Sequence, residues 1–270
     1  GQGETVGAQL TGDDRVRGVM FTGSTEVATL LQRNIASRLD AQGRPIPLIA
    51  ETGGMNAMIV DSSALTEQVV IDVLASAFDS AGQRCSALRV LCLQDEIADH
   101  TLKMLRGAMA ECRMGNPGRL TTDIGPVIDS EAKVNIERHI QTMRSKGRPV
   151  FQAVRENSED AREWQSGTFV APTLIELDDF AELQKEVFGP VLHVVRYNRN
   201  QLPELIEQIN ASGYGLTLGV HTRIDETIAQ VTGSAHVGNL YVNRNMVGAV
   251  VGVQPFGGEG LSGTGPKAGG

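Results

Sequence analysis

The sequence has little of what several classes of protein require. Its 270 residues include three cysteines and one tryptophan, and its formal net charge is −8. Lysine and arginine form no run, which argues against a nucleic-acid surface, because such a surface needs a basic stripe to neutralise phosphates. No apolar segment approaches the roughly 18 residues of a membrane span, and no charged and then apolar leader opens the chain. We therefore expect a cytoplasmic protein without a transmembrane segment.

The few cysteines and histidines argue against two kinds of site. Cys85, Cys92 and Cys112 cannot make a disulfide framework, and no two of them form a CxxC pair. The five histidines lie far apart and show no HExxH spacing. We expect no metal site, and the cysteine usage fits a reducing compartment.

What the sequence does contain is a regular alternation of helical and strand patterns. With 41% hydrophobic residues, it can bury a sizeable core in one large or two ordinary domains. The patterns predict helices over residues 25–39, 67–81, from about 96, 130–145, 203–211 and 225–232. They predict strands over residues 16–21, 87–93, 148–154, 169–177, 191–197, 216–221 and 239–243, with an apolar run at 45–50. This alternation predicts an α/β fold with a mainly parallel sheet.

The turn Thr22-Gly23-Ser24 connects the first predicted strand to the first predicted helix, with Ser24 as a plausible N-cap. A glycine turn before a helix presents free backbone N–H groups and the positive end of a helix dipole, where a phosphate can bind. An ordinary βα unit with nothing bound is the alternative.

Two further residues stand in settings where a small molecule could reach them. Glu51 follows the apolar run 45–50 and precedes two glycines, although a solvated acid at a strand end is an alternative interpretation. Cys85 follows the helix that Gly82 ends, in a polar and glycine-marked turn. Cys92 and Cys112 have the simpler explanation of small hydrophobes in a core.

Taken together, the motifs resemble the aldehyde dehydrogenase superfamily. They occur in the family's order and cover nearly the whole chain: FTGSTEV (21–27), ETGG (51–54), GQRCS (82–86), EVFGPV (186–191), GNLYVN (238–243), and PFGG followed by SGTG (255–265). The separation of Cys85 from Glu51 (85 − 51 = 34) also matches the family. The resemblance implies an aldehyde dehydrogenase fold, with part of a Rossmann-like NAD-binding domain and an α/β catalytic domain.

The resemblance implies a catalytic role for two residues and a cofactor role for four. Cys85 would add to the aldehyde carbonyl and carry a thioester, and Glu51 would be the general base that activates water. The implied cofactor is NAD, although the sequence leaves NADP open; Gly23 and Ser24 would lie by its pyrophosphate, Glu186 by the nicotinamide ribose, and Phe188 by the nicotinamide ring. Without the resemblance, Glu186 could be an exposed acid and Phe188 a core residue.

Ser86, Gly248 and Ala249 narrow the range of expected substrates. They resemble the Δ1-pyrroline-5-carboxylate dehydrogenase branch, in which a hydroxyl after the cysteine and backbone N–H groups of small residues hold the substrate's α-carboxylate. The alternative is that they are only small loop residues. The implied reaction is oxidation of L-glutamate 5-semialdehyde to L-glutamate; the rivals are another semialdehyde, or a non-catalytic module of the same fold.

Within that branch, the motifs more closely resemble the dehydrogenase module of bacterial bifunctional proline utilization A flavoproteins. This resemblance implies a homo-oligomeric parent polypeptide that also carries a proline dehydrogenase module with FAD, for which this chain has no residues. We expect residues 1–51 to be the end of the NAD-binding domain, 52–245 the catalytic domain, and 246–270 a substrate-anchoring loop with a glycine-rich return segment. The composition from Gly252 onward would also suit a flexible tail. Because the family's oxyanion asparagine would lie upstream of Gly1, we expect little activity from this chain alone.

Overall fold

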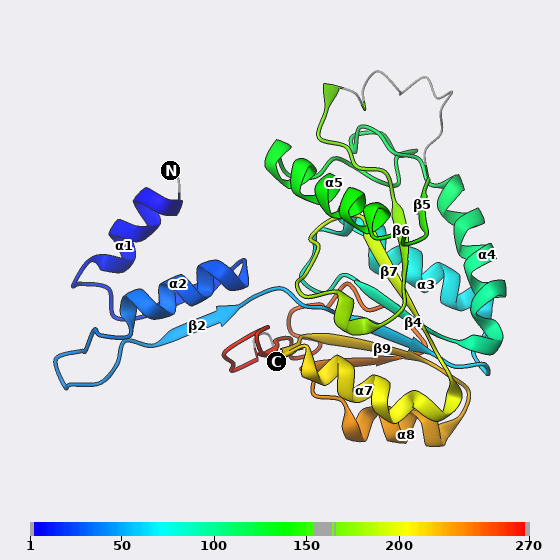
Figure 1. Ribbon diagram of the computed structural model, residues 1–270. Helices are drawn as coiled ribbons and strands as arrows, with labels where there is room; N and C mark the ends of the chain where they lie inside the picture. Colours follow the sequence, from blue (N-terminus) through cyan, green and yellow to red (C-terminus); the bar gives the residue numbers. More distant parts are fainter. Residues whose placement is uncertain (1–2, 154–163, 165, 268–270) are drawn as a thin grey trace.

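A computed structural model of the chain describes residues 3–153, 164 and 166–267, and Figure 1 shows an N-terminal arm standing beside a larger body. The N-terminal arm (residues 3–51) contains η1 (Gly3–Gly7), α1 (Ala8–Gly12), β1 (Val19–Thr22), α2 (Thr25–Ile35) and β2 (Leu48–Glu51). Strands β1 and β2 pair in parallel, with Val19 opposite Leu48 and Thr22 opposite Glu51. Strand β2 leads directly into the body, so it connects the two regions (Figure 1).

The body is built on a seven-stranded sheet of order β10-β9-β3-β4-β7-β6-β5. Its strands are β3 (Ala57–Val60), β4 (Val90–Gln94), β5 (Val150–Gln152), β6 (Thr173–Leu177), β7 (Val191–Tyr197), β9 (Thr217–His221) and β10 (Asn239–Val242). Every neighbouring pair is parallel except β5 with β6. The predicted α/β fold with a mainly parallel sheet is therefore confirmed.

Helices connect the strands of the body. They are α3 (Thr66–Phe78), α4 (Asp95–Glu111), α5 (Ser130–Ser145), α7 (Leu202–Ala211) and α8 (Asp225–Ser234), with short turns η2 (Asp79–Gly82), η3 (Phe180–Glu182) and η4 (Arg199–Gln201). Helices α3 and α4 pack against each other and against the centre of the sheet, whereas α7 and α8 lie together near β9 in Figure 1. No helix that the structure describes is both long enough and apolar enough to cross a membrane.

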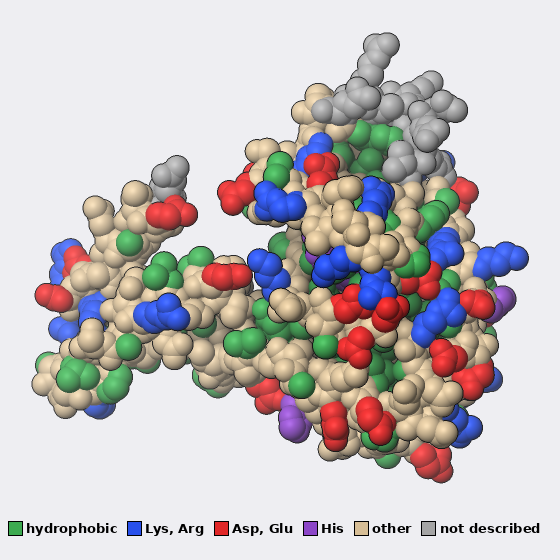
Figure 2. Space-filling model, viewed as in Figure 1, with side chains coloured by type: hydrophobic (Ala, Val, Ile, Leu, Met, Phe, Trp, Pro, Cys, Tyr) green, Lys and Arg blue, Asp and Glu red, His purple; other side chains and the backbone are tan. Residues whose placement is uncertain are grey.

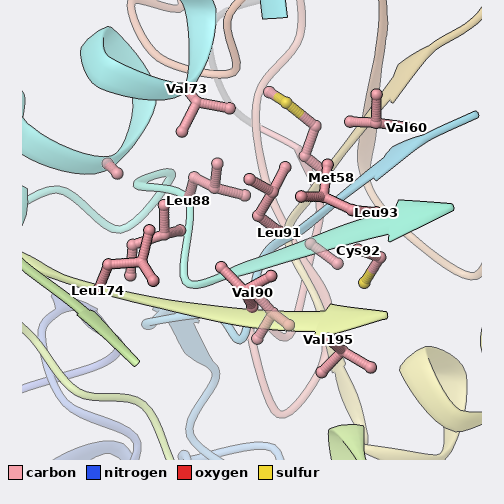
Figure 3. Close-up of a cluster of buried hydrophobic side chains, with 14 of the residues drawn as sticks. Met58, Val60, Val73, Leu88, Val90, Leu91, Cys92, Leu93, Leu174 and Val195 are labelled. Atoms are coloured by element: carbon pink, nitrogen blue, oxygen red, sulfur yellow. The ribbon is translucent and has the colours of Figure 1, made fainter. Parts of the chain in front are cut away.

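The core of the body lies around β3 and β4, as Figure 3 shows. All residues of both strands are buried, and side chains such as Met58, Leu91 and Leu93 meet Val73 of α3 there. Strands covered on both faces are near-continuous apolar runs without alternation. That is why the sequence patterns missed β3, which is only four residues long.

Several predicted boundaries were wrong, among them the starts of β1 and β6, which lie at Val19 and Thr173 and not at residues 16 and 169. Helix α2 ends at Ile35 and not near residue 39, and α3 ends at Phe78, three residues before the predicted end. Strand β4 begins at Val90 and not at residue 87, because the N–H groups of Leu88 and Arg89 bond to Ser76 and Asn56 outside the sheet. The strand β7 and the helix α5 have the predicted bounds.

The glycine-rich segment near the C-terminus is anchored, not a flexible tail, as far as Lys267. Strand β11 (Glu259–Gly260) pairs with β8 (Tyr214–Gly215). The N–H of Thr264 bonds to the carbonyl of Ala50 at 2.9 Å, so the segment also lies against β2. It thereby ties the end of the arm to the body.

Candidate active site

A cavity of about 960 Å³ lies where the arm meets the body. Its lining comes from the start of α2, the turn after β2, the loop before β4, the loop before β7 and the segment around residue 250. Its size is that of a typical small-molecule or cofactor site. Eight of the nine predicted site residues line it: Gly23, Ser24, Cys85, Ser86, Glu186, Phe188, Gly248 and Ala249.

The loop that carries Cys85 begins with an unusual backbone. Ser80, Ala81 and Gly82 all have positive φ (56°, 55° and 66°), a conformation that costs a non-glycine residue about 1 to 3 kcal/mol. Gly82 is also required by close packing, since a Cβ there would lie 2.2 Å from the carbonyl oxygen of Gly189. Strain of this kind persists only when its surroundings hold it in place.

Asn56, which the sequence analysis did not single out, supports the same loop from below. Its side chain is buried and donates to the carbonyls of Cys85 (2.7 Å) and Ala87 (2.8 Å), while its oxygen accepts from the N–H of Thr217 (3.1 Å). An amide with both ends bonded to buried backbone groups fixes the position of Cys85 relative to β9.

The side chain of Cys85 is half-buried. Burial raises its pKa above the ordinary value, the N–H of Ser86 opposes that shift, and the negative charge of Glu186 adds to it. Because the thiolate is the nucleophilic form, Cys85 needs a base before it can react.

Glu186 and Phe188 lie on the wall of the cavity beside a buried arginine. The Glu186 side chain is 15% exposed, so it is not the exposed acid of the alternative interpretation, and it forms an ion pair of 2.8 Å with Arg89. Phe188 is 44% exposed and therefore not a core residue. A Cβ at Gly53 would lie 1.7 Å from Oε2 of Glu186, so this close approach requires glycine.

The start of α2 faces the cavity, with Gly23 and Ser24 in its lining. The Ser24 side chain caps the helix by accepting from the N–H of Val27 at 3.2 Å, and Gly23 donates to the carbonyl of Glu51 at 3.1 Å. These two bonds hold the glycine turn at the mouth of the cavity, with the positive end of the helix dipole toward it.

Glu51 is the one predicted site residue that does not line the cavity. Its carboxylate turns toward the glycine-rich segment: Oε2 accepts from the N–H of Gly258 at 3.0 Å, and Oε1 is buried without a hydrogen-bond partner among the described residues. Burial raises its pKa. The next residues, Thr52 and Gly53, do line the cavity, so Glu51 lies one residue behind its wall.

Gly248 and Ala249 form the rim opposite the Cys85 loop. They are exposed, and no hydrogen bond within the described part of the chain occupies their backbone N–H groups. Ser86 is buried beside Cys85 and lines the same space. Within residues 3–153, 164 and 166–267, no group of three His, Cys, Asp or Glu side chains is arranged to hold a metal ion.

Arg89 is the second residue that the sequence analysis missed. It is wholly buried, and the only signal for it was a single charge inside an apolar run, Ala87 to Leu93. A charged residue is almost never fully buried unless it is paired. The apolar pattern predicts a plain buried strand, whereas the structure pairs the arginine within it with Glu186.

Comparisons with known proteins support a common origin for this arrangement. The profile of the aldehyde dehydrogenase family matches residues 1–270. The chain is 99% identical over 270 residues to the bifunctional protein PutA of Escherichia coli K12, covering all of the chain and 20% of that protein. It is 35% identical to a 1-pyrroline-5-carboxylate dehydrogenase of Geobacillus kaustophilus, of which it covers 51%.

A solved structure agrees with these sequence relatives. A Thermus 1-pyrroline-5-carboxylate dehydrogenase with bound NAD superimposes with a TM-score of 0.89 at 36% identity, over all of this chain and 51% of that one. The chain thus spans about a fifth of the length of the bifunctional relative and about half of the single-function relatives.

Proposed function

Because the chain belongs to the aldehyde dehydrogenase family, we propose that its site serves the NAD-dependent oxidation of L-glutamate 5-semialdehyde to L-glutamate. The observation that carries this proposal is the meeting of the Cys85 thiol, the Glu186 carboxylate and the start of α2 in one cavity. A thiol can form a covalent adduct with an aldehyde, and a helix start can hold a dinucleotide phosphate. The relative named 1-pyrroline-5-carboxylate dehydrogenase supports the substrate, since that compound opens to glutamate semialdehyde.

The residues present fit NAD. Gly23 and Ser24 would hold the pyrophosphate, Glu186 the nicotinamide ribose and Phe188 the nicotinamide ring. Because Gly53 has no side chain, the carboxylate of Glu186 has room at the wall of the cavity. The Thermus relative crystallised with NAD supports this assignment. When bound, NAD⁺ supplies the acceptor for the hydride that leaves the substrate's carbonyl carbon.

Cys85 provides the covalent chemistry. The thiol proton passes to solvent, the sulfur bonds to the aldehyde carbon, and the carbonyl electron pair moves to the oxygen. The backbone N–H groups of Ser86 and of Cys85 itself lower the pKa of the sulfur, which favours its thiolate form. Loss of hydride leaves a thioester on Cys85.

Glu51 completes the reaction as general base. It takes a proton from water, the water oxygen bonds to the thioester carbon, and the C–S bond breaks to release glutamate and the Cys85 thiolate. Burial raises its pKa, which makes the carboxylate a stronger base. To do this the carboxylate must turn from the N–H of Gly258 toward the cavity.

Three residues would select an aldehyde that carries an α-carboxylate. The unoccupied N–H groups of Gly248 and Ala249 and the hydroxyl of Ser86 can form a nest for that anion without a lysine or arginine. The nest favours aldehydes that carry a carboxylate over aldehydes that do not.

We assign residues 1–51 to an NAD-binding domain, 52–245 to a catalytic domain and 246–270 to the substrate loop and its return segment; residues 1–2, 154–163, 165 and 268–270 lie outside the described part of the chain. The parent is a homo-oligomeric bifunctional polypeptide of the cytoplasm, with FAD in a separate proline dehydrogenase module. The 99% identical bifunctional relative supports this parent. We expect the 270 residues alone to have little activity, since the full cofactor cleft needs more of that polypeptide.

A Cys85→Ala variant of the full-length polypeptide tests the reaction. Removing the nucleophile should lower kcat/KM for glutamate semialdehyde on the order of 10⁴-fold or more, measured as NADH formation. Cys112→Ala is the matched control, because Cys112 lies at the end of α4 and does not line the cavity. Unchanged oxidation by Cys85→Ala would remove the enzyme hypothesis and leave the non-catalytic module.

The choice of substrate has its own test. The unaltered polypeptide should prefer glutamate semialdehyde to succinate semialdehyde in kcat/KM, and Ser86→Ala should narrow that preference by raising KM for the former. Each lost hydrogen bond to a charged group is worth about 1.5–3 kcal/mol, or roughly 10- to 100-fold. A preference for succinate semialdehyde would favour the rival dehydrogenase.

A further inference from the structure

Arg89 lies beside the cavity with a wholly buried side chain whose guanidinium is fully hydrogen-bonded. It is 0% exposed and is the largest fully buried side chain in the described part of the chain. A guanidinium without water is expensive to bury unless its charge is paired and its donors are bonded. The buried charge of Arg89 therefore requires an ion-pair partner and hydrogen-bond acceptors around it.

All five N–H donors of the guanidinium have acceptors. Nε donates to Oε1 of Glu186 at 3.1 Å, and Nη2 donates to the same oxygen at 2.8 Å and to the carbonyl of Arg84 at 3.1 Å. Nη1 donates to the carbonyls of Gly82 (2.7 Å) and Gly189 (3.3 Å). An arginine offers five N–H groups in a fixed planar fork, so the site uses the full capacity of the side chain.

The acceptors belong to the two loops that carry the proposed chemistry. The carbonyls of Gly82 and Arg84 stand in the loop that ends in Cys85, whereas Glu186 and Gly189 stand in the loop before β7. The guanidinium carbon also lies 5.1 Å from the centre of the Phe188 ring, a cation–π distance. One side chain thus joins the thiol's loop to the loop of the proposed cofactor residues.

The loop before Cys85 needs such a support. Ser80, Ala81 and Gly82 adopt left-handed backbone, which relaxes unless its surroundings prevent it. The shortest carbonyl contact of Arg89 is with Gly82, the last of these three residues. The arginine therefore holds the strained turn at the point where it passes into the Cys85 loop.

Glu186 depends on the same contacts. Burial raises the pKa of Glu186, and the charge and hydrogen bonds of Arg89, together with the N–H of Gly54, oppose that shift. Both Arg89 bonds use Oε1. Oε2 is left on the side of Gly53. A ligand hydroxyl that bonds to this carboxylate would therefore meet an acceptor whose orientation Arg89 has set.

We propose that Arg89 is a positioning residue that fixes Cys85 and Glu186 relative to each other, so that the substrate carbon on the thiol is aligned with the cofactor held by the carboxylate. The proposal rests on the function proposed above. Lysine cannot replace Arg89, because an ammonium has three donors at one point and cannot reach both loops at once.

The first test compares Arg89→Lys and Arg89→Met in a full-length polypeptide that contains this chain. We expect kcat per titrated Cys85 to fall on the order of 10²-fold in Arg89→Met, because a displacement of about 1 Å between reacting groups costs that much. KM for the aldehyde should change little, since Ser86, Gly248 and Ala249 are untouched. Arg89→Lys should not restore kcat.

Arg196→Met is the matched control. Arg196 also pairs with two carboxylates, those of Asp99 and Glu176, but does not line the cavity. A purely structural arginine would lower the number of active sites and leave kcat per site unchanged. If kcat per site in both Arg89 variants equals that of Arg196→Met and the unaltered enzyme, the proposal is wrong.

A double-mutant cycle tests the coupling of the two loops. Glu186→Gln should lower kcat several-fold less in the Arg89→Lys background than in the unaltered enzyme, because the carboxylate is already misplaced there. Strictly multiplicative effects would contradict a shared role. The lysine variant decides the question if Arg89→Met does not fold.

Two measurements do not depend on the reaction. The rate at which iodoacetamide alkylates Cys85 and the Kd for NAD should both change in Arg89→Lys and remain constant in Arg196→Met. If the unaltered enzyme does not oxidise glutamate semialdehyde, the proposed function is wrong. The alkylation rate and the Kd for NAD still test whether Arg89 positions Cys85 and Glu186. Unaltered alkylation together with an unaltered Kd in Arg89→Lys would overturn that proposal.

Discussion

The N-terminal arm and the body meet at one cavity but are packed very differently. Of residues 3–51, three are buried, namely Ile35, Ile46 and Ala50, whereas every residue of β3 and β4 in the body is buried. Met20 of β1 is 83% exposed. Figure 2 shows apolar side chains on the surface of the arm where it extends from the body.

The difference in packing shows how the site residues of each region are held in position. The body supplies Cys85 and Glu186 on loops that Asn56 and Arg89 hold by buried hydrogen bonds. The arm supplies Glu51 and the turn at Ser24, and its position depends on β2 and on the glycine-rich segment that lies against it. The loops of the body that carry Cys85 and Glu186 are therefore fixed by buried side-chain hydrogen bonds, whereas the described part of the arm is held mainly by backbone bonds to the glycine-rich segment.

The largest expected effect is the cost of deleting a core side chain of the body. Leu91→Ala in β4, where Leu91 is 0% exposed, should lower the free energy of unfolding of this chain by about 2–5 kcal/mol. Met20→Ala in the arm should change it by no more than about 0.5 kcal/mol. Urea denaturation followed by circular dichroism measures both. Equal losses of unfolding free energy in the two variants would contradict the difference in packing between the body and the arm.

Acid should destabilise the body through its buried histidine pair. His139 Nε2 and His193 Nε2 lie 2.8 Å apart, and burial together with the charge of His139 lowers the pKa of His193 to about 3. In the unfolded chain the pKa of His193 is about 6.5, so below that pH its imidazole binds a proton that it does not bind in the folded state. Stability is therefore fully present above pH 6.5 and falls by about 1.4 kcal/mol per pH unit between pH 6.5 and about 3.

Replacing His193 checks this slope. His193→Gln should flatten the dependence of the unfolding free energy on pH over that window, whereas His100→Gln, at an exposed position of α4, should leave it unchanged. Urea midpoints at half-unit steps of pH give the slopes. A slope that persists in His193→Gln would assign the acid sensitivity to other groups.

The smallest expected effect compares two helix caps. Ser24 caps α2 in the arm, and Asp129 caps α5 in the body by accepting from the N–H of Ala132 at 2.8 Å. Each change to alanine should cost about 1 kcal/mol. For Asp129→Ala that cost should appear in global unfolding, but for Ser24→Ala only as faster hydrogen exchange of the α2 amides. A global loss from Ser24→Ala would mean that the arm is coupled to the body more tightly than its burial indicates.

Prediction from the sequence succeeded where the signal is local. Helix α5 has its predicted bounds because an aspartate cap and a 3.6-residue apolar period are both readable in the sequence. Strand β3 was missed because a short strand that is buried on both faces shows no period. The ends of α2 and α3 were wrong because contacts with other segments, not local pattern, decide where they stop.

The sequence by itself determined the family, the α/β fold and eight of the residues that line the cavity, because spaced motifs such as GQRCS are readable without coordinates. Only the tertiary structure decided that Glu51 faces the glycine-rich segment, that Asn56 holds the carbonyl of Cys85, and that Arg89 joins two loops about 100 residues apart in the chain. The physical reason is that hydrogen bonds between distant segments depend on where the sheet brings backbone carbonyls together, and no local pattern records those positions.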